Sequence, residues 1–334
     1  MTPDPLSGPA QNLPVFRAED FRVSQGANLG DPLSCLDDLM LDDVYTLRSV
    51  ARARRLTLHA GDGARLTIGS DSDVGGAGAD IHLDCALTLM SPDGQITDAI
   101  VLVETDAGGD IAHVYLLPLA PLAARTPYAL VGTDRDEVAT KFAHMTCARF
   151  TRGTHITLAS GAQKPIEDLA VGDRVLTRND GAQQVRWIGQ STVRAVGDFA
   201  PIRIRAGVLN NDRDLVVSPD HRLFIYQRKD RLGAGRSELL VKARHLVNGD
   251  SVVVQDGGFV DYFELLFDSH QIIYAEGIAA ESMLIDTRTR PALPDEVTEL
   301  LSEHASAGLS GLDVTETLLD RPDAAELLRR ASLR

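Results

Sequence analysis

The chain has 334 residues, of which 44% are hydrophobic, and a formal net charge of −15 from 48 acidic and 33 basic residues. This length predicts at least two domains with their own cores, and the composition is ordinary for a globular protein. The acidic surplus argues against a nucleic-acid-binding protein, because phosphate contacts need a basic face. The three cysteines, Cys35, Cys85 and Cys147, lie far apart and do not suggest a disulfide framework.

The sequence carries no targeting or membrane signal that we recognise. The first twenty residues lack a basic start followed by an unbroken apolar run, and no later stretch approaches eighteen consecutive apolar residues. We therefore expect neither a cleavable signal peptide nor a membrane span. The expected location is the cytoplasm, or the outside of the cell by a route without a signal peptide.

Charge is distributed unevenly along the chain. Lys and Arg number 10 against 21 Asp and Glu in residues 1–146, 19 against 18 in residues 147–290, and 4 against 9 in residues 291–334. The nearly neutral middle segment therefore indicates a separate unit between two acidic flanks. We predict an acidic N-terminal domain of unknown role over 1–146, a second domain over 147–290 and a tail over 291–334.

Short apolar runs separated by turn signals dominate most of the chain. In residues 45–146 they include IHLDCALTLM, which is followed by SPDG, and in residues 150–285 they include APIRIRAG and DLVVSPDHRLFIY. Runs of this kind predict strands, so both segments are expected to be all-β. Beyond residue 290, LPDEVTELLSEHASAG and RPDAAELLRRAS change to helical spacing, each with a proline at its start. The tail is therefore predicted to form two short helices.

Four stretches of the middle segment carry motifs in a fixed order. They are FTRGTHITLASGAQKPIEDLAVGDRVLTR at 150–178, LVVSPDHRLFI at 215–225, ARHLVNGDSVVV at 243–254 and FDSHQIIYAEGIAAES at 267–282. Together they resemble the Hint domain, the self-cleaving module shared by inteins and Hedgehog proteins, and are closest to bacterial Hint variants outside true inteins. The resemblance covers about two-fifths of the chain. It implies a Hint-type β fold preceded by a smaller β-rich domain.

The chemistry that this resemblance implies is nucleophilic. Cys147 would attack the carbonyl group of the Thr146–Cys147 bond and convert the peptide into a thioester, while His221 would donate a proton to the departing nitrogen. Ser218, in the Ser-x-x-His block, would hold the scissile backbone by hydrogen bonds. His270 would orient a reacting group, and its neighbour Asp268 would set a tautomer or the pKa of a cysteine.

Two departures from the family pattern bear on this chemistry. The family places its cysteine five residues before the threonine of the Gly-Thr pair, and here that place belongs to Arg149. Cys147 stands two residues upstream, about 7 Å away along an extended strand. Splicing also needs a terminal His-Asn pair, whose places are taken here by Glu281 and Ser282. We therefore expect no splicing, and at most a half reaction in which water or a small nucleophile breaks a thioester at Cys147.

Each candidate residue also has a structural interpretation. Cys147 fits a small buried hydrophobic residue, and His221 or His270 fits a core histidine that is hydrogen-bonded to a turn. His144 and Cys147 form an H-x-x-C pair, but the other histidines lack a recognisable zinc spacing. We therefore expect no metal and no cofactor.

Two functions remain open from the sequence. In the first, the chain is a single-turnover autoprotease whose substrate is its own N-terminal domain, cleaved at Thr146–Cys147. In the second, the Hint fold has lost its nucleophile and serves as a scaffold or interaction module.

Overall fold

The computed structural model describes residues 10–60, 65–227, 230, 235, 237–285, 288–290 and 293. The chain divides into two compact units. The N-terminal unit is formed by Met1–His144 with Asp286–Ala292, and the C-terminal unit by Met145–Ile285 with Leu293–Arg334. The boundary falls inside helix α1 (Val138–Thr146). The two predicted helices of the tail lie outside the described residues.

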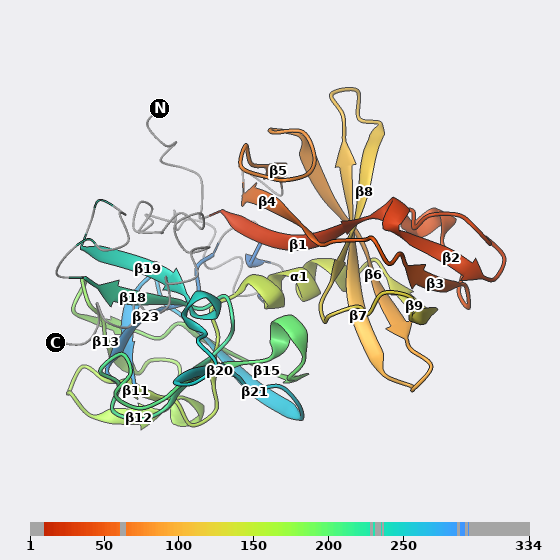
Figure 1. Ribbon diagram of the computed structural model, residues 1–334. Helices are drawn as coiled ribbons and strands as arrows, with labels where there is room; N and C mark the ends of the chain where they lie inside the picture. Colours follow the sequence, from red (N-terminus) through yellow and green to blue (C-terminus); the bar gives the residue numbers. More distant parts are fainter. Residues whose placement is uncertain are drawn as a thin grey trace. The chain divides into compact units, whose positions relative to one another are not determined.

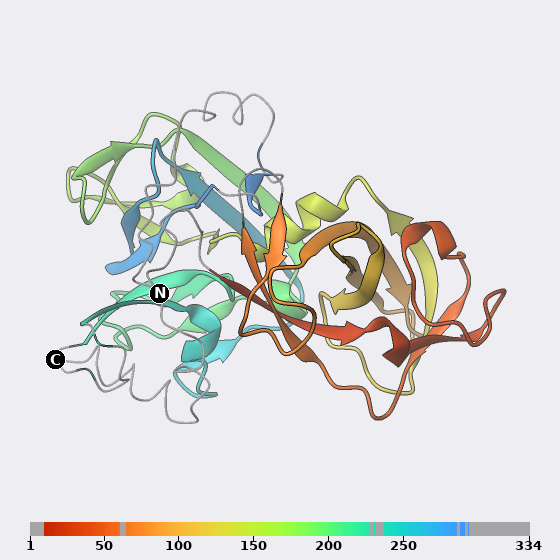
Figure 2. The same cartoon turned by 90° about the horizontal axis from the view of Figure 1, so that it is seen from above.

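Nine strands make up the described part of the N-terminal unit, coloured red to yellow-green in Figure 1. Their bounds are β1 Gln11–Arg17, β2 Phe21–Gln25, β3 Val44–Leu47, β4 Arg54–Ala60, β5 Leu66–Ile68, β6 Asp80–Met90, β7 Ile96–Thr105, β8 Ile111–Pro118 and β9 Pro127–Asp134. They form one sheet in the order β2-β3-β9-β6-β5-β4-β1-β8-β7, and β7 also pairs with β6. The strands β6, β7, β8, β1, β4 and β5 therefore close into a ring, whose curvature is visible in Figure 2.

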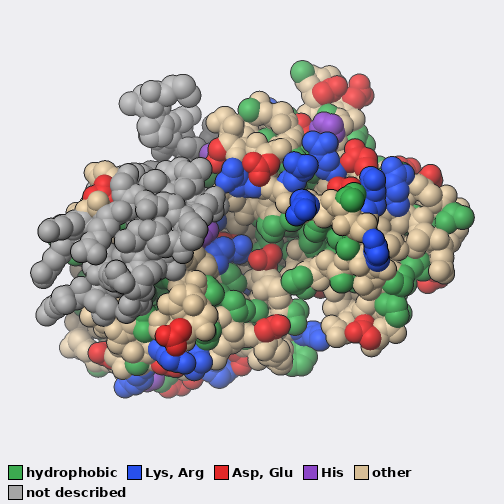
Figure 3. Space-filling model, viewed as in Figure 1, with side chains coloured by type: hydrophobic (Ala, Val, Ile, Leu, Met, Phe, Trp, Pro, Cys, Tyr) green, Lys and Arg blue, Asp and Glu red, His purple; other side chains and the backbone are tan. Residues whose placement is uncertain are grey.

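The long strand β6 joins the ring to the three strands outside it, β9, β3 and β2. Its first residues pair with β5 on one side, its last residues pair with β9 on that same side, and β7 runs along the whole of its other side. Cys85, Leu87 and Leu89 alternate into a core that is wholly buried. Alternation of this kind is typical of a strand that buries one face. On the face shown in Figure 3, acidic and basic side chains are interspersed over this unit.

Fourteen short strands make up the described part of the C-terminal unit. Their bounds are β10 Phe150–Thr151, β11 His155–Thr157, β12 Gln163–Pro165, β13 Arg174–Leu176, β14 Ala182–Gln184, β15 Trp187–Arg194, β16 Ile202–Ile204, β17 Leu215–Val217, β18 Arg222–Tyr226, β19 Glu238–Lys242, β20 Val252–Val254, β21 Phe259–Leu266, β22 Ile272–Ala275 and β23 Ile278–Glu281. One sheet has the order β15-β21-β10-β17-β16-β20 and another β12-β11-β22-β23-β18-β19, while β13 and β14 form a hairpin. Figure 1 shows β23, β18 and β19 side by side.

The sequence contains two Leu-x-x-Gly-Asp motifs, Leu169–Asp173 and Leu246–Asp250, and they fold alike. Each follows a strand, passes through a short 3-10 turn at 166–168 or 243–246, and leads into the next strand, β13 or β20. Gly172 and Gly249 have φ angles of 99° and 75°, a region that glycine adopts without a steric cost. Both copies bury apolar side chains in one core, in which Phe150, Phe263 and Val217 also take part.

The prediction of an all-β fold is confirmed, since strands form both units and α1 is the single α-helix in the described part of the chain.

Candidate functional site

The residues before β10 lie beside the turn that follows β17. Phe150 pairs with Val217 in an antiparallel ladder, and the ladder continues one step further. The amide of Ser218 donates to the carbonyl oxygen of Arg149 at 2.9 Å, and the amide of Arg149 donates to Ser218 Oγ at 3.1 Å. The backbone of Arg149 is therefore held on both its polar groups by Ser218.

Ser218 also contacts Cys147, the predicted nucleophile, at its backbone carbonyl group. Its hydroxyl donates to the carbonyl oxygen of Cys147 at 3.2 Å. Ser218 and Cys147 are each 1% exposed. One hydroxyl therefore bridges the carbonyl of Cys147 and the amide of Arg149, and it fixes the segment 147–149 against the Ser-x-x-His turn.

His221 is completely buried above this segment. Its Nδ1 lies 3.0 Å from the carbonyl oxygen of Arg149, its Nε2 lies 3.1 Å from the carbonyl oxygen of Glu281, and the ring of Phe150 meets its edge. Burial lowers the pKa of His221, although Glu281 and the two carbonyl groups oppose this effect. A neutral imidazole has a single N–H, so only one of the two contacts can be a hydrogen bond at a time.

Glu281 is the centre of a buried ion-pair network. Its carboxylate accepts the amide of Arg222 at 3.0 Å and the Nε of Arg222 at 2.7 Å, and His270 Nε2 lies 3.3 Å from it. Burial raises the pKa of the Glu281 carboxyl, but Arg222 and His270 outweigh burial and hold that pKa well below its usual range. The network ties β23 to β18, directly beside His221.

Ser282 is held by two hydrogen bonds to the backbone of Gln271. It is fully buried, its hydroxyl accepts the amide of Gln271 at 2.9 Å, and its own amide donates to the carbonyl of Gln271 at 2.8 Å.

The predicted site residues are only partly brought together. Cys147, Ser218 and His221 meet around the backbone of residues 147–149, and His270 joins them through Glu281. Asp268 instead receives both ends of the Arg186 guanidinium, at 2.8 and 2.7 Å, and this pair is half-exposed. The carboxylate of Asp268 is thus engaged at the surface by Arg186.

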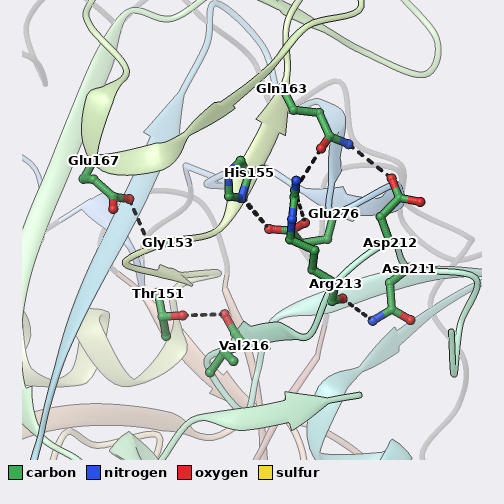
Figure 4. A network of polar contacts seen from close by, with 10 residues as sticks. All are labelled: Thr151, Gly153, His155, Gln163, Glu167, Asn211, Asp212, Arg213, Val216 and Glu276. Carbon is green, nitrogen blue, oxygen red and sulfur yellow. Dashed lines mark hydrogen bonds and ion pairs between the residues drawn. The ribbon is translucent and has the colours of Figure 1, made fainter. Parts of the chain in front are cut away.

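A second polar network, which sequence reasoning missed, lies around Glu276 in the same unit (Figure 4). The carboxylate of Glu276 is 1% exposed and lies between His155 and Arg213. It accepts the amide of His155 at 2.7 Å, and His155 Nδ1 and Arg213 Nη1 lie 3.0 and 3.4 Å from it. Glu276 has a φ angle of 49°, which is unusual for a residue other than glycine. These contacts offset the backbone strain and fasten the β22–β23 turn to β11.

Neither a metal-binding cluster nor a membrane-spanning helix is found among the described residues. No group of three or more His, Cys, Asp or Glu side chains in that part of the chain is arranged to hold a metal ion. Among the same residues, no helix is long and apolar enough to cross a membrane.

Residues 147–287 match the family model of the Hint domain. This segment is a Hint domain. The match begins at Cys147 and includes Arg149, the Ser218–His221 turn and the Glu281–Ser282 pair. It places the segment in a family of self-processing domains.

Other known proteins are similar to the chain over limited stretches. The gp41-1 intein structure is 16% identical, with 40% of this chain and 97% of that chain covered and a TM-score of 0.25. The Ssp DnaB mini-intein variant M86 is 13% identical, with coverages of 42% and 96% and a TM-score of 0.29. The catalytic subunit of the V-type proton ATPase of Candida tropicalis is 30% identical over 86 residues, which are 24% of this chain and only 8% of that protein.

The Hint domain contains a buried arginine beside the Ser218–His221 turn. Arg149 is 0% exposed, and the central carbon of its guanidinium lies 4.3 Å from the centroid of the Tyr262 ring. From the family resemblance we expected this residue at the place of the family's cysteine, but the sequence does not indicate that its side chain is buried. The ion pair of Glu281 with Arg222 was missed too, because these residues are 59 positions apart.

Proposed function

We propose that this Hint domain does not cleave the chain and acts as a stable module that keeps the N-terminal unit covalently attached. The observation that supports it is the contact of Ser218 and His221 with the backbone of Arg149. The nitrogen that Ser218 contacts is the one that leaves when residue 149 is the nucleophile. A guanidinium remains protonated at any physiological pH and cannot attack a carbonyl group.

The surroundings of the Arg149 backbone support the same conclusion. His221 faces two carbonyl oxygens through its two ring nitrogens, whereas a general acid for this reaction must reach the departing amide nitrogen. Glu281 and Ser282 are both occupied by buried contacts, Glu281 with Arg222 of β18 and Ser282 with Gln271 just before β22. The family's catalytic positions have thus become part of the packing of the domain.

One observation favours a second candidate, autoprocessing at Thr146–Cys147. Ser218 Oγ donates to the carbonyl oxygen of Cys147, so the cysteine is part of the segment that the Ser-x-x-His turn holds. In that reaction the Cys147 thiol adds to the carbonyl carbon of Thr146, the C–N bond breaks, the nitrogen of Cys147 takes a proton, and a thioester forms. A shift of about two residues in the register of the segment would be needed to bring Cys147 to the place of Arg149.

The test is the intact mass of the full-length chain, incubated with and without dithiothreitol or hydroxylamine, beside the Cys147→Ala variant. We expect both proteins to remain whole under every condition and to give the same spectra. Fragments that break between residues 146 and 147, grow with added nucleophile and disappear in Cys147→Ala would overturn the proposal and establish the second candidate.

A further inference from the structure

Four residues of the C-terminal unit form a polar cluster on one face of a sheet. Glu264 and Tyr262 lie two residues apart on β21, and Tyr262 pairs with Ser191 on β15. Phe150 pairs with Phe263, so Arg149, one residue earlier, lies opposite Glu264 in the same antiparallel register. Side chains that are opposite each other, or two residues apart on one strand, share a face. We call Arg149, Ser191, Tyr262 and Glu264 the Arg149 cluster. Its face is opposite to the one that carries Phe263 into the core.

Three residues of this cluster carry polar atoms that are shielded from solvent and have no hydrogen-bond partner among the described residues. Arg149 is 0% exposed, and none of its Nε, Nη1 and Nη2 atoms has a hydrogen-bond partner among the described residues. The same holds in that part of the chain for Oε1 of Glu264, which is 4% exposed, and for Oγ of Ser191. Buried polar groups in native proteins are almost always hydrogen-bonded, so three such groups on one face point to a binding partner.

The geometry around the guanidinium selects the kind of partner. The central carbon of the guanidinium lies 4.3 Å from the centroid of the Tyr262 ring and 5.6 Å from that of Phe199. These cation–π contacts use no N–H group, so within the described part of the chain the five N–H groups of Arg149 have no acceptor. The hydroxyl of Tyr262 is not available to them, because it donates to the carbonyl oxygen of Phe199 at 3.0 Å. A planar guanidinium edge matches the two oxygens of a planar oxyanion.

Glu264 is suited to complete such a site. Burial raises the pKa of its carboxyl, and Arg149 opposes this effect to a smaller extent. A protonated carboxyl donates a hydrogen bond, as the hydroxyl of Ser191 also does. Room for the carboxyl depends on Gly189, since a Cβ at that position would lie 2.7 Å from Glu264 Oε2 and 2.3 Å from the Trp187 ring.

We propose that Arg149, Glu264 and Ser191 bind a small planar oxyanion of the carboxylate class, such as formate, acetate or bicarbonate. The anion accepts from the guanidinium of Arg149 and balances its charge. It also accepts from Ser191, and from Glu264 when that carboxyl carries its proton. No bond is made or broken. This binding is independent of the proposed function, because an intact chain and a cleaved chain can both hold the anion.

Binding is measured on the full-length chain by thermal unfolding in increasing sodium formate, acetate or bicarbonate, with sodium chloride at equal ionic strength as reference. A ligand of the folded state raises the melting temperature in a saturable way. We expect this rise for the wild type and for an Arg205→Met control, whose arginine is half-exposed in the same unit. Arg149→Lys should weaken binding at least about tenfold, as the loss of one charge-assisted hydrogen bond implies.

Because Arg149 variants can fail to fold, two further measurements use a milder variant and the wild type. Glu264→Gln keeps a donor, so it should bind the anion but lose the weakening that the wild type shows as pH rises and Glu264 ionises. A crystal structure of the wild type grown in formate should show the anion on the Arg149 edge. Ordered water alone, a direct Arg149–Glu264 ion pair, or an equal thermal response to chloride would each overturn the proposal.

Discussion

His221 Nδ1 lies 3.0 Å from the carbonyl oxygen of Arg149, inside the buried centre of the Hint domain. A general acid for amide cleavage must give its proton to nitrogen, yet the imidazole faces oxygen on this side and again at Glu281. The ring therefore contributes packing and one hydrogen bond, which is a structural role for a residue that the motif marks as catalytic.

The first prediction concerns Arg149→Cys. This change puts a thiol on the residue whose amide Ser218 already holds, so we expect cleavage between residues 148 and 149 when hydroxylamine is added. The thiol adds to the carbonyl carbon of Ala148, the C–N bond breaks, and the nitrogen of residue 149 takes a proton. Hydroxylamine then displaces the sulfur and leaves a hydroxamate on Ala148. Intact mass spectrometry identifies both fragments.

The control for this experiment is Arg149→Cys combined with Ser218→Ala, which should stay whole because the hydroxyl that holds the amide of residue 149 is gone. Cleavage that persists in the double variant would show that Ser218 has no part in it. An uncut Arg149→Cys chain that is folded by circular dichroism would contradict the prediction and would show that more than the side chain at residue 149 stops the reaction.

The second prediction concerns Glu281→Gln. Removing this charge leaves Arg222 buried without its carboxylate, and breaking a buried ion pair costs about 3–5 kcal/mol. Because the pKa of Glu281 is lower when folded than when unfolded, its contribution is present above the unfolded pKa of about 4.5 and is lost as pH falls below that value. Urea unfolding at pH 7 and pH 4 should therefore show a smaller difference between wild type and variant at pH 4. Asp268→Asn, in a half-exposed pair, should cost no more than about 1 kcal/mol.

The third prediction concerns the pH dependence of stability above this range. The pKa of His221 is lowered on folding, so near pH 6 the unfolded chain binds a proton there that the folded chain does not. Stability should consequently fall as pH drops from about 7 to 5, by up to about 1.4 kcal/mol per pH unit from this residue. His221→Gln should flatten this dependence of stability on pH, whereas His113→Gln, at an exposed histidine, should leave it unchanged. An unaltered slope in His221→Gln would argue that His221 is already charged in the folded chain.

The fourth prediction concerns Gly189→Ala. A methyl group there collides with the Trp187 ring and the Glu264 carboxyl, and such overpacking costs about 1–3 kcal/mol. Gly76→Ala is a suitable control, because its Cβ would meet atoms only at 3.5 Å and beyond. Chemical denaturation of both variants measures the difference, and equal stabilities would mean that β15 moves to accept the methyl group.

The strands could be predicted because apolar runs and turn signals mark them locally, and the order of the motifs led us to expect Cys147, Ser218 and His221 in one site. The sequence did not predict ion pairs between residues far apart in the chain, or the burial of acidic side chains. Glu264 lies in the run YFELLF, where an acidic residue normally marks a solvent-facing position, yet it is only 4% exposed. Asp268 was expected beside the reacting groups, but Arg186, 82 residues away, takes its carboxylate. Neither the burial of Glu264 nor the partner of Asp268 follows from the local sequence pattern.

The ring of strands in the N-terminal unit also has a consequence for the time course of folding. The β6–β7 and β7–β8 hairpins join residues close in sequence and can form early, whereas ring closure pairs Phe16 of β1 with Leu116 of β8. Closing the loop between Phe16 and Leu116 lowers the entropy of the chain before the β1–β8 contacts form, and this slows folding. We therefore expect hydrogen exchange during refolding to protect β6 and β7 first and the β1–β8 seam last.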